Sequence, residues 1–134
     1  MELGRSMTPQ ARHAVRPVPA KGAILSNAVV KVAQRLGVSQ TKVAETLGVS
    51  GPTASRLFSG KYTLDPDRRK EWELAALFVR VYRSLDSIVA SEEKARAWLN
   101  SGNRALGGRP IDLISSAEGL IRVLQYLDAS RGKN

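Results

Sequence analysis

The chain of 134 residues contains no cysteine and a single histidine, His13. Without cysteine there are no disulfides and no thiolate ligands, and one histidine cannot build a zinc site. We therefore expect no metal and no cofactor, in a protein suited to the reducing cytoplasm. No apolar run approaches the roughly 20 residues that a membrane-spanning helix needs, so we expect no membrane insertion.

Groups that could carry out catalysis are equally scarce. Enzymes need an activated nucleophile, a paired acid and base, or a metal. Acidic residues such as Glu92 stand four residues before a basic one such as Arg96, which is the spacing of surface ion pairs on helices. The Gly107-Gly108 pair is not followed by the lysine and hydroxyl residue of a phosphate-binding loop. The sequence therefore predicts a protein that binds and does not catalyse.

Basic residues are distributed unevenly in a chain whose formal net charge is +9. Residues 21–61 carry six basic side chains against Glu45 alone, whereas residues 62–100 carry seven of each sign. Clustered positive charge favours a polyanionic partner, because phosphates release counterions when lysine and arginine neutralise them. This pattern favours nucleic acid as a partner over a protein that is merely basic and soluble.

Residues 40–57, QTKVAETLGVSGPTASRL, predict two short helices joined by a tight turn. Gly48 provides a residue for positive φ at the turn, Ser50 can cap the second helix, and Pro52 suits a first helical turn. The small and apolar residues that fall in phase on the two helices are Val43, Ala44, Leu47, Ala54 and Leu57. This spacing predicts a DNA-binding helix-turn-helix; the alternative is an ordinary helical hairpin.

The second of these helices is the expected recognition helix. We predict that Thr53, Ser55 and Arg56 face the major groove, with Arg56 as the best reader of a guanine edge. Other polar residues around the motif would hold phosphates and set the docking angle. The complete predicted DNA-binding set is Gln40, Thr41, Lys42, Ser50, Thr53, Ser55, Arg56 and Lys61.

The rest of the chain has helical periodicity and almost no strand signal, so we expect an all-α fold. A first helix should end at Gly37, and Ser39 and Ser91 should cap later helices. Ser115 and Glu118 have the spacing of a capping box for a last helix. Residues 1–20 contain three prolines and no apolar segment, which predicts a disordered basic arm and no secretory signal.

A long helix is predicted to begin at Asp65-Pro66 and to reach Val89. It carries two apolar stripes, whereas a surface helix needs one. Either its own domain encloses the helix, or one stripe packs against a second copy of the chain. The residues that we assign to such a homodimer interface are Leu74, Phe78, Val81 and Leu85.

The segment from Trp98 to Val123 contains a string that periodicity does not explain. Its distinctive residues are Trp98, Leu99, Asn103, Leu106, Gly107, Gly108, Pro110, Leu113, Glu118, Gly119 and Val123. This string resembles the toxin-binding domain of the Xre/MbcA/ParS antitoxin family, and with the helix-turn-helix the resemblance covers about residues 25–128. Many relatives have two residues between Gly-Gly and Pro, where this chain has Arg109 alone.

The resemblance implies an antitoxin that blocks the active site of a RES-domain toxin, an NAD-consuming enzyme, and represses its own operon by binding double-stranded DNA. Its expected organisation is a basic arm at 1–20, a helix-turn-helix domain at 21–64, and a dimerisation and toxin-binding domain at 65–134. That last domain would comprise the long helix and a small helical C-terminal domain. Basic side chains and backbone donors would occupy the toxin's dinucleotide site. The predicted toxin-binding residues are Arg104, Gly107, Gly108, Arg109, Arg131, Lys133 and Asn134.

Two other functions stay open at this point. A stand-alone helix-turn-helix repressor is the main alternative, and an adjacent toxin-sized reading frame would favour the antitoxin. A protein–protein adaptor without DNA binding is the third, because Gly51 and Pro52 place no polar side chain at the entry to the major groove.

Overall fold

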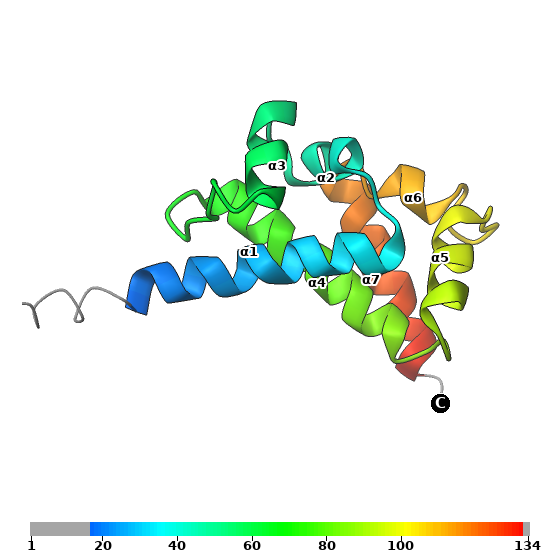
Figure 1. Cartoon of the computed structure of the whole chain (residues 1–134). Coiled ribbons are helices and arrows are strands. Elements are labelled where there is room, and N and C mark those ends of the chain that lie inside the picture. Colours follow the sequence, from blue (N-terminus) through cyan, green and yellow to red (C-terminus); the bar gives the residue numbers. More distant parts are fainter. Residues whose placement is uncertain (1–16, 133–134) are drawn as a thin grey trace, which may run out of the picture.

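Seven helices follow one another in the computed structural model, which describes residues 17–132 (Figure 1). They are α1 (Pro17–Leu36), α2 (Gln40–Leu47), α3 (Gly51–Phe58), α4 (Arg69–Asp86), α5 (Glu92–Asn100), α6 (Pro110–Leu113) and α7 (Ala117–Gly132). The all-α prediction is confirmed, with the helix-turn-helix before the C-terminal helices. No helix of the described residues is long and apolar enough to cross a membrane.

The turns of the helix-turn-helix have the geometry that the sequence requires. Gly48 adopts a left-handed conformation with φ of 73° and donates its N–H to the carbonyl of Ala44. The hydroxyls of Ser39 and Ser50 accept the N–H groups of Lys42 and Thr53, each at 3.1 Å. The predicted caps of α2 and α3 are therefore confirmed, and the same holds for Ser91 at α5.

The boundaries of three helices differ from the predictions. α1 begins at Pro17, within the stretch expected to be a disordered arm; residues 1–16 lie outside the described residues. α4 begins at Arg69 and ends at Asp86, because the Asp65 carboxylate accepts the N–H of Asp67 at 2.9 Å and closes a turn there. At α7 the capping hydroxyl belongs to Ser116, which accepts the Gly119 N–H at 3.0 Å.

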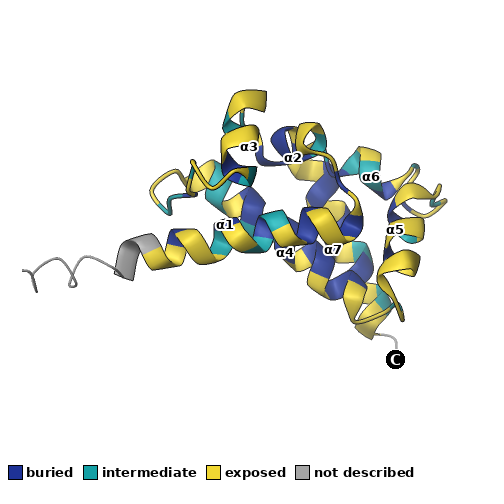
Figure 2. Ribbon diagram, in the orientation of Figure 1, coloured by how far each residue is buried: buried dark blue, intermediate teal, exposed yellow. Residues whose placement is uncertain are grey.

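α4 occupies the centre of the molecule and contacts α1, α2, α5 and α7. Buried side chains of both halves of the chain join in one core, and Figure 2 shows the buried faces of the helices turned toward one another. Phe78 and Leu85 of α4 are completely buried, and Trp98 of α5 stacks on Tyr126 of α7 with ring centroids 6.3 Å apart. Burial of this apolar surface holds the helix-turn-helix to the C-terminal helices.

The side chains assigned to a homodimer interface all lie in this core. Leu74, Phe78, Val81 and Leu85 are 0–7% exposed within a single chain. The chain itself encloses α4, which was the alternative to burial against a second copy. These four residues are therefore corrected from interface to core, because helices on two sides of α4 explain its two apolar stripes.

Gly119 explains one part of the family-like string. It lies in the first turn of α7, where a Cβ atom would overlap the carbonyl oxygen of Leu113 at the end of α6. Only a residue without a side chain lets α6 and α7 approach this closely. The Glu-Gly pair is thus a packing requirement of the turn between the two helices.

Replacing Gly119 with alanine is expected to lower the free energy of unfolding by about 3 kcal/mol, since backbone must move to admit the methyl group. Urea denaturation followed by circular dichroism measures the change. Gly132→Ala, in the same helix with no atom near the added Cβ, is the matched control and should change stability by less than about 1 kcal/mol. Equal stability of the two variants would contradict the close-packing explanation.

Candidate DNA and toxin interfaces

The exposed face of α3 carries the side chains predicted to read DNA. Ser55 and Arg56 are exposed and Thr53 is half-buried, whereas Ala54 and Leu57 on the opposite face are buried. Thr53 Oγ1 accepts hydrogen bonds from the Ser50 hydroxyl at 2.9 Å and from Arg56 Nη2 at 3.4 Å. The structure therefore brings Ser50, Thr53 and Arg56 together at the surface of one helix.

Three residues predicted to hold phosphates flank this helix at the surface. Gln40 and Thr41 are exposed in the first turn of α2, and Lys61 is exposed directly after α3. The Lys61 N–H donates to the carbonyl of Arg56 at 2.8 Å, which fixes its backbone against α3. Among the described residues, no carboxylate lies within ion-pair distance of Arg56 or Lys61. Their charges are therefore available to an anion.

Lys42 differs from this prediction, because its ammonium group is engaged within the chain. Lys42 Nζ donates to the Ser115 hydroxyl at 2.8 Å and lies 3.1 Å from Glu45 Oε1, while Ser115 Oγ donates to the same carboxylate at 3.0 Å. The hydrogen bonds from Lys42 and Ser115 lower the pKa of Glu45. Lys42 thus joins α2 to the α6–α7 turn and does not extend toward a phosphate.

The segment between α3 and α4 is held by a polar cluster. Arg68 Nη1 donates to the Tyr62 hydroxyl at 2.6 Å, and this hydroxyl donates to Glu71 of α4. Burial and the bond to Glu71 raise the pKa of Tyr62. On the other side, the buried Ser26 hydroxyl of α1 accepts the Leu64 N–H at 2.9 Å. These contacts fix the chain that leaves the recognition helix.

The loop between α5 and α6 is organised by Asn103. Its side-chain oxygen accepts the Leu106 N–H at 3.0 Å, and its backbone carbonyl accepts the N–H groups of Gly107 and Gly108 at 2.9 and 3.2 Å. Gly107 takes a left-handed conformation with φ of 80°. The expectation that this loop offers free backbone donors is therefore wrong at Gly107 and Gly108, because Asn103 already accepts both.

The basic residues predicted to bind toxin have different surroundings. Arg104 is exposed on the loop, whereas Arg109 donates two hydrogen bonds to Asp112 at 2.9 and 3.1 Å and thereby lowers the pKa of that carboxyl. Arg131 pairs with Asp128 at 3.3 Å. Lys133 and Asn134 lie outside the described residues. The structure does not bring Arg131 to the loop; the Arg104–Asp112 surface is the compact basic candidate.

Sequence reasoning missed three side chains that shape this region. Asn103 was part of the resemblance, but its place four residues before Gly107 also suits an asparagine that binds the following backbone. Arg122 of α7 donates to the Leu106 carbonyl at 2.9 Å and ties the loop to the last helix. The bond between Ser115 and Glu45 spans 70 residues, and no local pattern predicts it.

Comparisons with known proteins identify the two halves. Residues 9–80 match the antitoxin Xre-like helix-turn-helix domain, and residues 84–133 match the antitoxin Xre/MbcA/ParS C-terminal toxin-binding domain. The chain belongs to the Xre/MbcA/ParS antitoxin family. It is thus an antitoxin of a toxin–antitoxin system, as the sequence resemblance implied. The two matches meet inside α4, the helix that both halves share.

A solved structure supports this assignment for the antitoxin. A chain of the crystal structure of the M. tuberculosis MbcT–MbcA toxin–antitoxin complex is similar with a TM-score of 0.61 and 26% sequence identity. The similarity covers 82% of the antitoxin and 96% of that chain. No curated protein matches the sequence.

Asn103→Ala is expected to open the loop, because the buried N–H of Leu106 loses its acceptor; the cost should be about 1–2 kcal/mol. Amide hydrogen exchange at Leu106, Gly107 and Gly108 should become faster. Asn100→Ala, which removes only a surface bond to the Arg96 carbonyl, is the control and should leave these amides unchanged. Unaltered exchange in Asn103→Ala would contradict its organising role.

Proposed function

We propose that this antitoxin neutralises a RES-type, NAD-degrading toxin by covering its active site, and that it represses its own operon by binding DNA through α3. The antitoxin acts by binding and catalyses no reaction. The observation that carries this proposal is the succession of an Xre-like helix-turn-helix and a toxin-binding domain over residues 9–133. The similar chain comes from a complex of an antitoxin with its toxin.

The proposed DNA contact uses Arg56 in the major groove and Gln40, Thr41 and Lys61 on phosphates. Arginine is suited to guanine because its guanidinium can donate to O6 and N7 together. A homodimer would present two such helices to half-sites about 34 Å apart, or a multiple of that distance. Lys42 is left out of this contact, since its ammonium group binds Ser115 and Glu45.

The proposed toxin contact uses Arg104 and Arg109. Arg104 is exposed, and Arg109 would exchange its surface pair with Asp112 for a more strongly anionic partner. Exposed ion pairs contribute little to stability, so the exchange is inexpensive. The guanidinium groups would lie where the toxin binds the phosphates of its dinucleotide, an expectation that depends on the toxin class implied by the family.

Arg56→Ala is expected to weaken binding to the operator by about 1–3 kcal/mol and to relax the base preference at one position. Fluorescence anisotropy with operator DNA and single-base variants measures both effects. Lys94→Ala, which removes a positive charge from exposed α5, is the control and should bind as the wild type does. An Arg56→Ala protein with unchanged affinity and base preference would refute the role of Arg56.

Arg104→Glu with Arg109→Glu is expected to weaken the toxin complex by about 2 kcal/mol or more, because two positive charges become negative opposite an anion-binding site. Survival of cells that express the neighbouring toxin should fall, while operator binding persists. Lys94→Glu is the charge-matched control. Deletion of residues 131–134 tests the basic tail in the same assay. All experiments use the full chain, since both halves share one core.

Full rescue by these variants would assign neutralisation to another surface. If the neighbouring gene is not toxic, the stand-alone repressor becomes the better function. The exposed α3, with Arg56 outside any ion pair among the described residues, favours this second candidate over an adaptor that does not bind DNA.

A further inference from the structure

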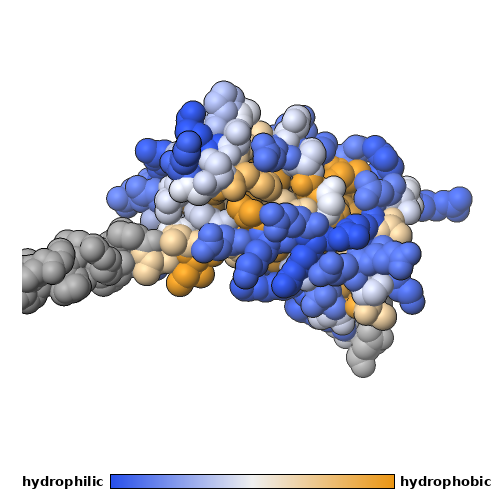
Figure 3. Space-filling model, in the orientation of Figure 1, coloured by the Kyte–Doolittle hydropathy of each residue, from blue (hydrophilic) through white to orange (hydrophobic). Residues whose placement is uncertain are grey.

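A groove between α1 and α4 leaves apolar side chains uncovered. It has a volume of about 360 Å³, and its apolar lining consists of Ile24, Leu25, Ala28, Trp72, Ala76 and Val79. Ile24 is 70% exposed, more than the other exposed large hydrophobic residues of the described chain, Ile88 and Ile121. Figure 3 shows hydrophobic side chains gathered near the N-terminal part of α1. A lone exposed isoleucine is ordinary, but one continuous with a groove that contains a tryptophan indicates an interaction surface.

The helix that carries Ile24 also extends beyond its support. Figure 1 shows the first turns of α1 projecting past the other helices. Within the chain, Gly22 packs so closely on the segment after α3 that a Cβ atom would overlap the Leu64 carbonyl, which covers one side of α1. The side that bears Ile24 has no such cover. Short helices are marginal in water unless an apolar face is packed, so a partner on this side would stabilise α1.

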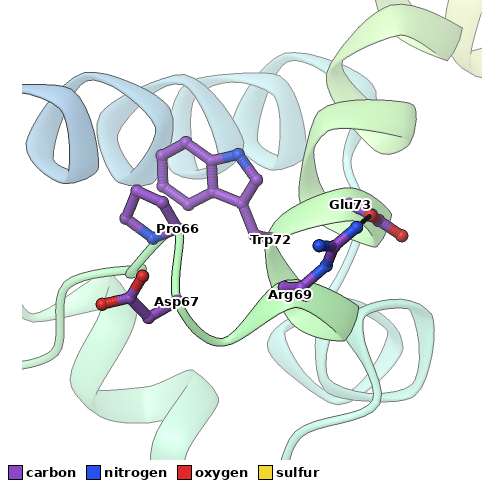
Figure 4. A pocket seen from close by; sticks show the side chains of 5 residues that line it. All are labelled: Pro66, Asp67, Arg69, Trp72 and Glu73. Carbon is purple, nitrogen blue, oxygen red and sulfur yellow. Dashed lines mark hydrogen bonds and ion pairs between the residues drawn. The ribbon is translucent and has the colours of Figure 1, made fainter.

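The charges beside the groove indicate which partner fits. Glu73, Ala76, Arg80 and Arg83 follow one another at steps of three and four residues, which places them on one exposed face of α4. The N-terminal end of this face is acidic at Glu73, which lines a neighbouring pocket with Asp67 and Trp72 (Figure 4). Its C-terminal end is basic at Arg80 and Arg83. A face with opposite charges at its two ends is complementary to its own antiparallel copy.

We propose that this face binds a second copy of the antitoxin, with the two α4 helices antiparallel. Glu73 and Arg83 are equally far from the midpoint between Ala76 and Arg80. Alignment of the two copies at this midpoint sets each Glu73 opposite the other copy's Arg83. It also sets each small Ala76 opposite the other copy's Arg80, whose aliphatic stem can lie over it. Such a contact is isologous, as two-fold dimers require.

The same arrangement covers the apolar groove. Trp72 borders both the acidic pocket and the groove, so each copy's Ile24 would be covered when the two faces meet. The internal partners of this face are exposed pairs, Arg69 with Glu73 at 3.3 Å and Arg80 with Asp128 at 3.9 Å. Pairs of this kind are weak and compete little with contacts between copies. This inference rests on the homodimer of the proposed function and assigns it a surface.

The test is a charge exchange measured by sedimentation equilibrium on the full chain without toxin. Wild-type protein is expected to be dimeric at high micromolar concentration. Glu73→Arg and Arg83→Glu should each raise the dimer dissociation constant about tenfold or more, because two attractive pairs become repulsive. The double variant restores opposite charges and should return the constant toward the wild-type value. Lys94→Glu, away from this face, should have no effect.

Ile24→Ser tests the apolar part and should also favour the monomer, whereas Ile121→Ser, at an exposed isoleucine of α7, is its control. Thermal unfolding of each variant shows whether the fold is kept; the rescue in the double variant separates interface loss from misfolding. A monomeric wild type would overturn both the homodimer and this surface. A dimer unaffected by Glu73→Arg and Arg83→Glu would overturn this surface alone. Variants that weaken toxin binding of a monomeric wild type would assign the face to the toxin and overturn the proposal. Operator binding and toxin neutralisation are measured separately and do not depend on these outcomes.

Discussion

Burial of α4 between helices from both ends of the chain is the contact on which the rest of the antitoxin depends. Phe78, Val81 and Leu85 are buried, and α1 and α2 pack on one part of the helix while α5 and α7 pack on others. A chain of this length has little apolar surface to spare, so two separate cores would each be marginal. Sharing one central helix lets the DNA-binding and toxin-binding parts stabilise each other.

Polar contacts then fix the two parts at their margins. Arg96 of α5 donates to the carbonyl of Arg35 at the end of α1, at 2.7 Å, and Ser115 bonds to Glu45 and Lys42 of α2. These ties connect the helix that precedes the recognition helix to the turn that precedes α7. Removal of the helix-turn-helix would therefore expose apolar surface of α4 and break these bonds, so the C-terminal part is not an independent unit.

The family-like residues of the C-terminal part have two different physical roles. Gly119 admits the Leu113 carbonyl and permits a tight turn, while Asn103 accepts the backbone N–H groups of the loop. Neither role requires contact with a toxin. The charged residues that remain at the surface, such as Arg104, are the part of this region left to recognise a partner.

Local rules were enough to predict the helix-turn-helix and most caps from sequence. Gly48, Ser39, Ser50 and Ser91 act on backbone within a few residues, and such effects are written in the local sequence. They failed where two interpretations satisfy the same spacing, as with Ser115 and Ser116, or with Asp65 as a helix cap and as a turn.

Only the tertiary structure decided what each apolar stripe of α4 packs against, because periodicity records that a face is buried and not by what. The engagement of Lys42 and of the loop amides likewise required residues distant in sequence to meet in space. The amino-acid sequence by itself determined the helices, their turns and the family; the packing of the chain determined which polar groups remain at the surface for DNA and for a toxin.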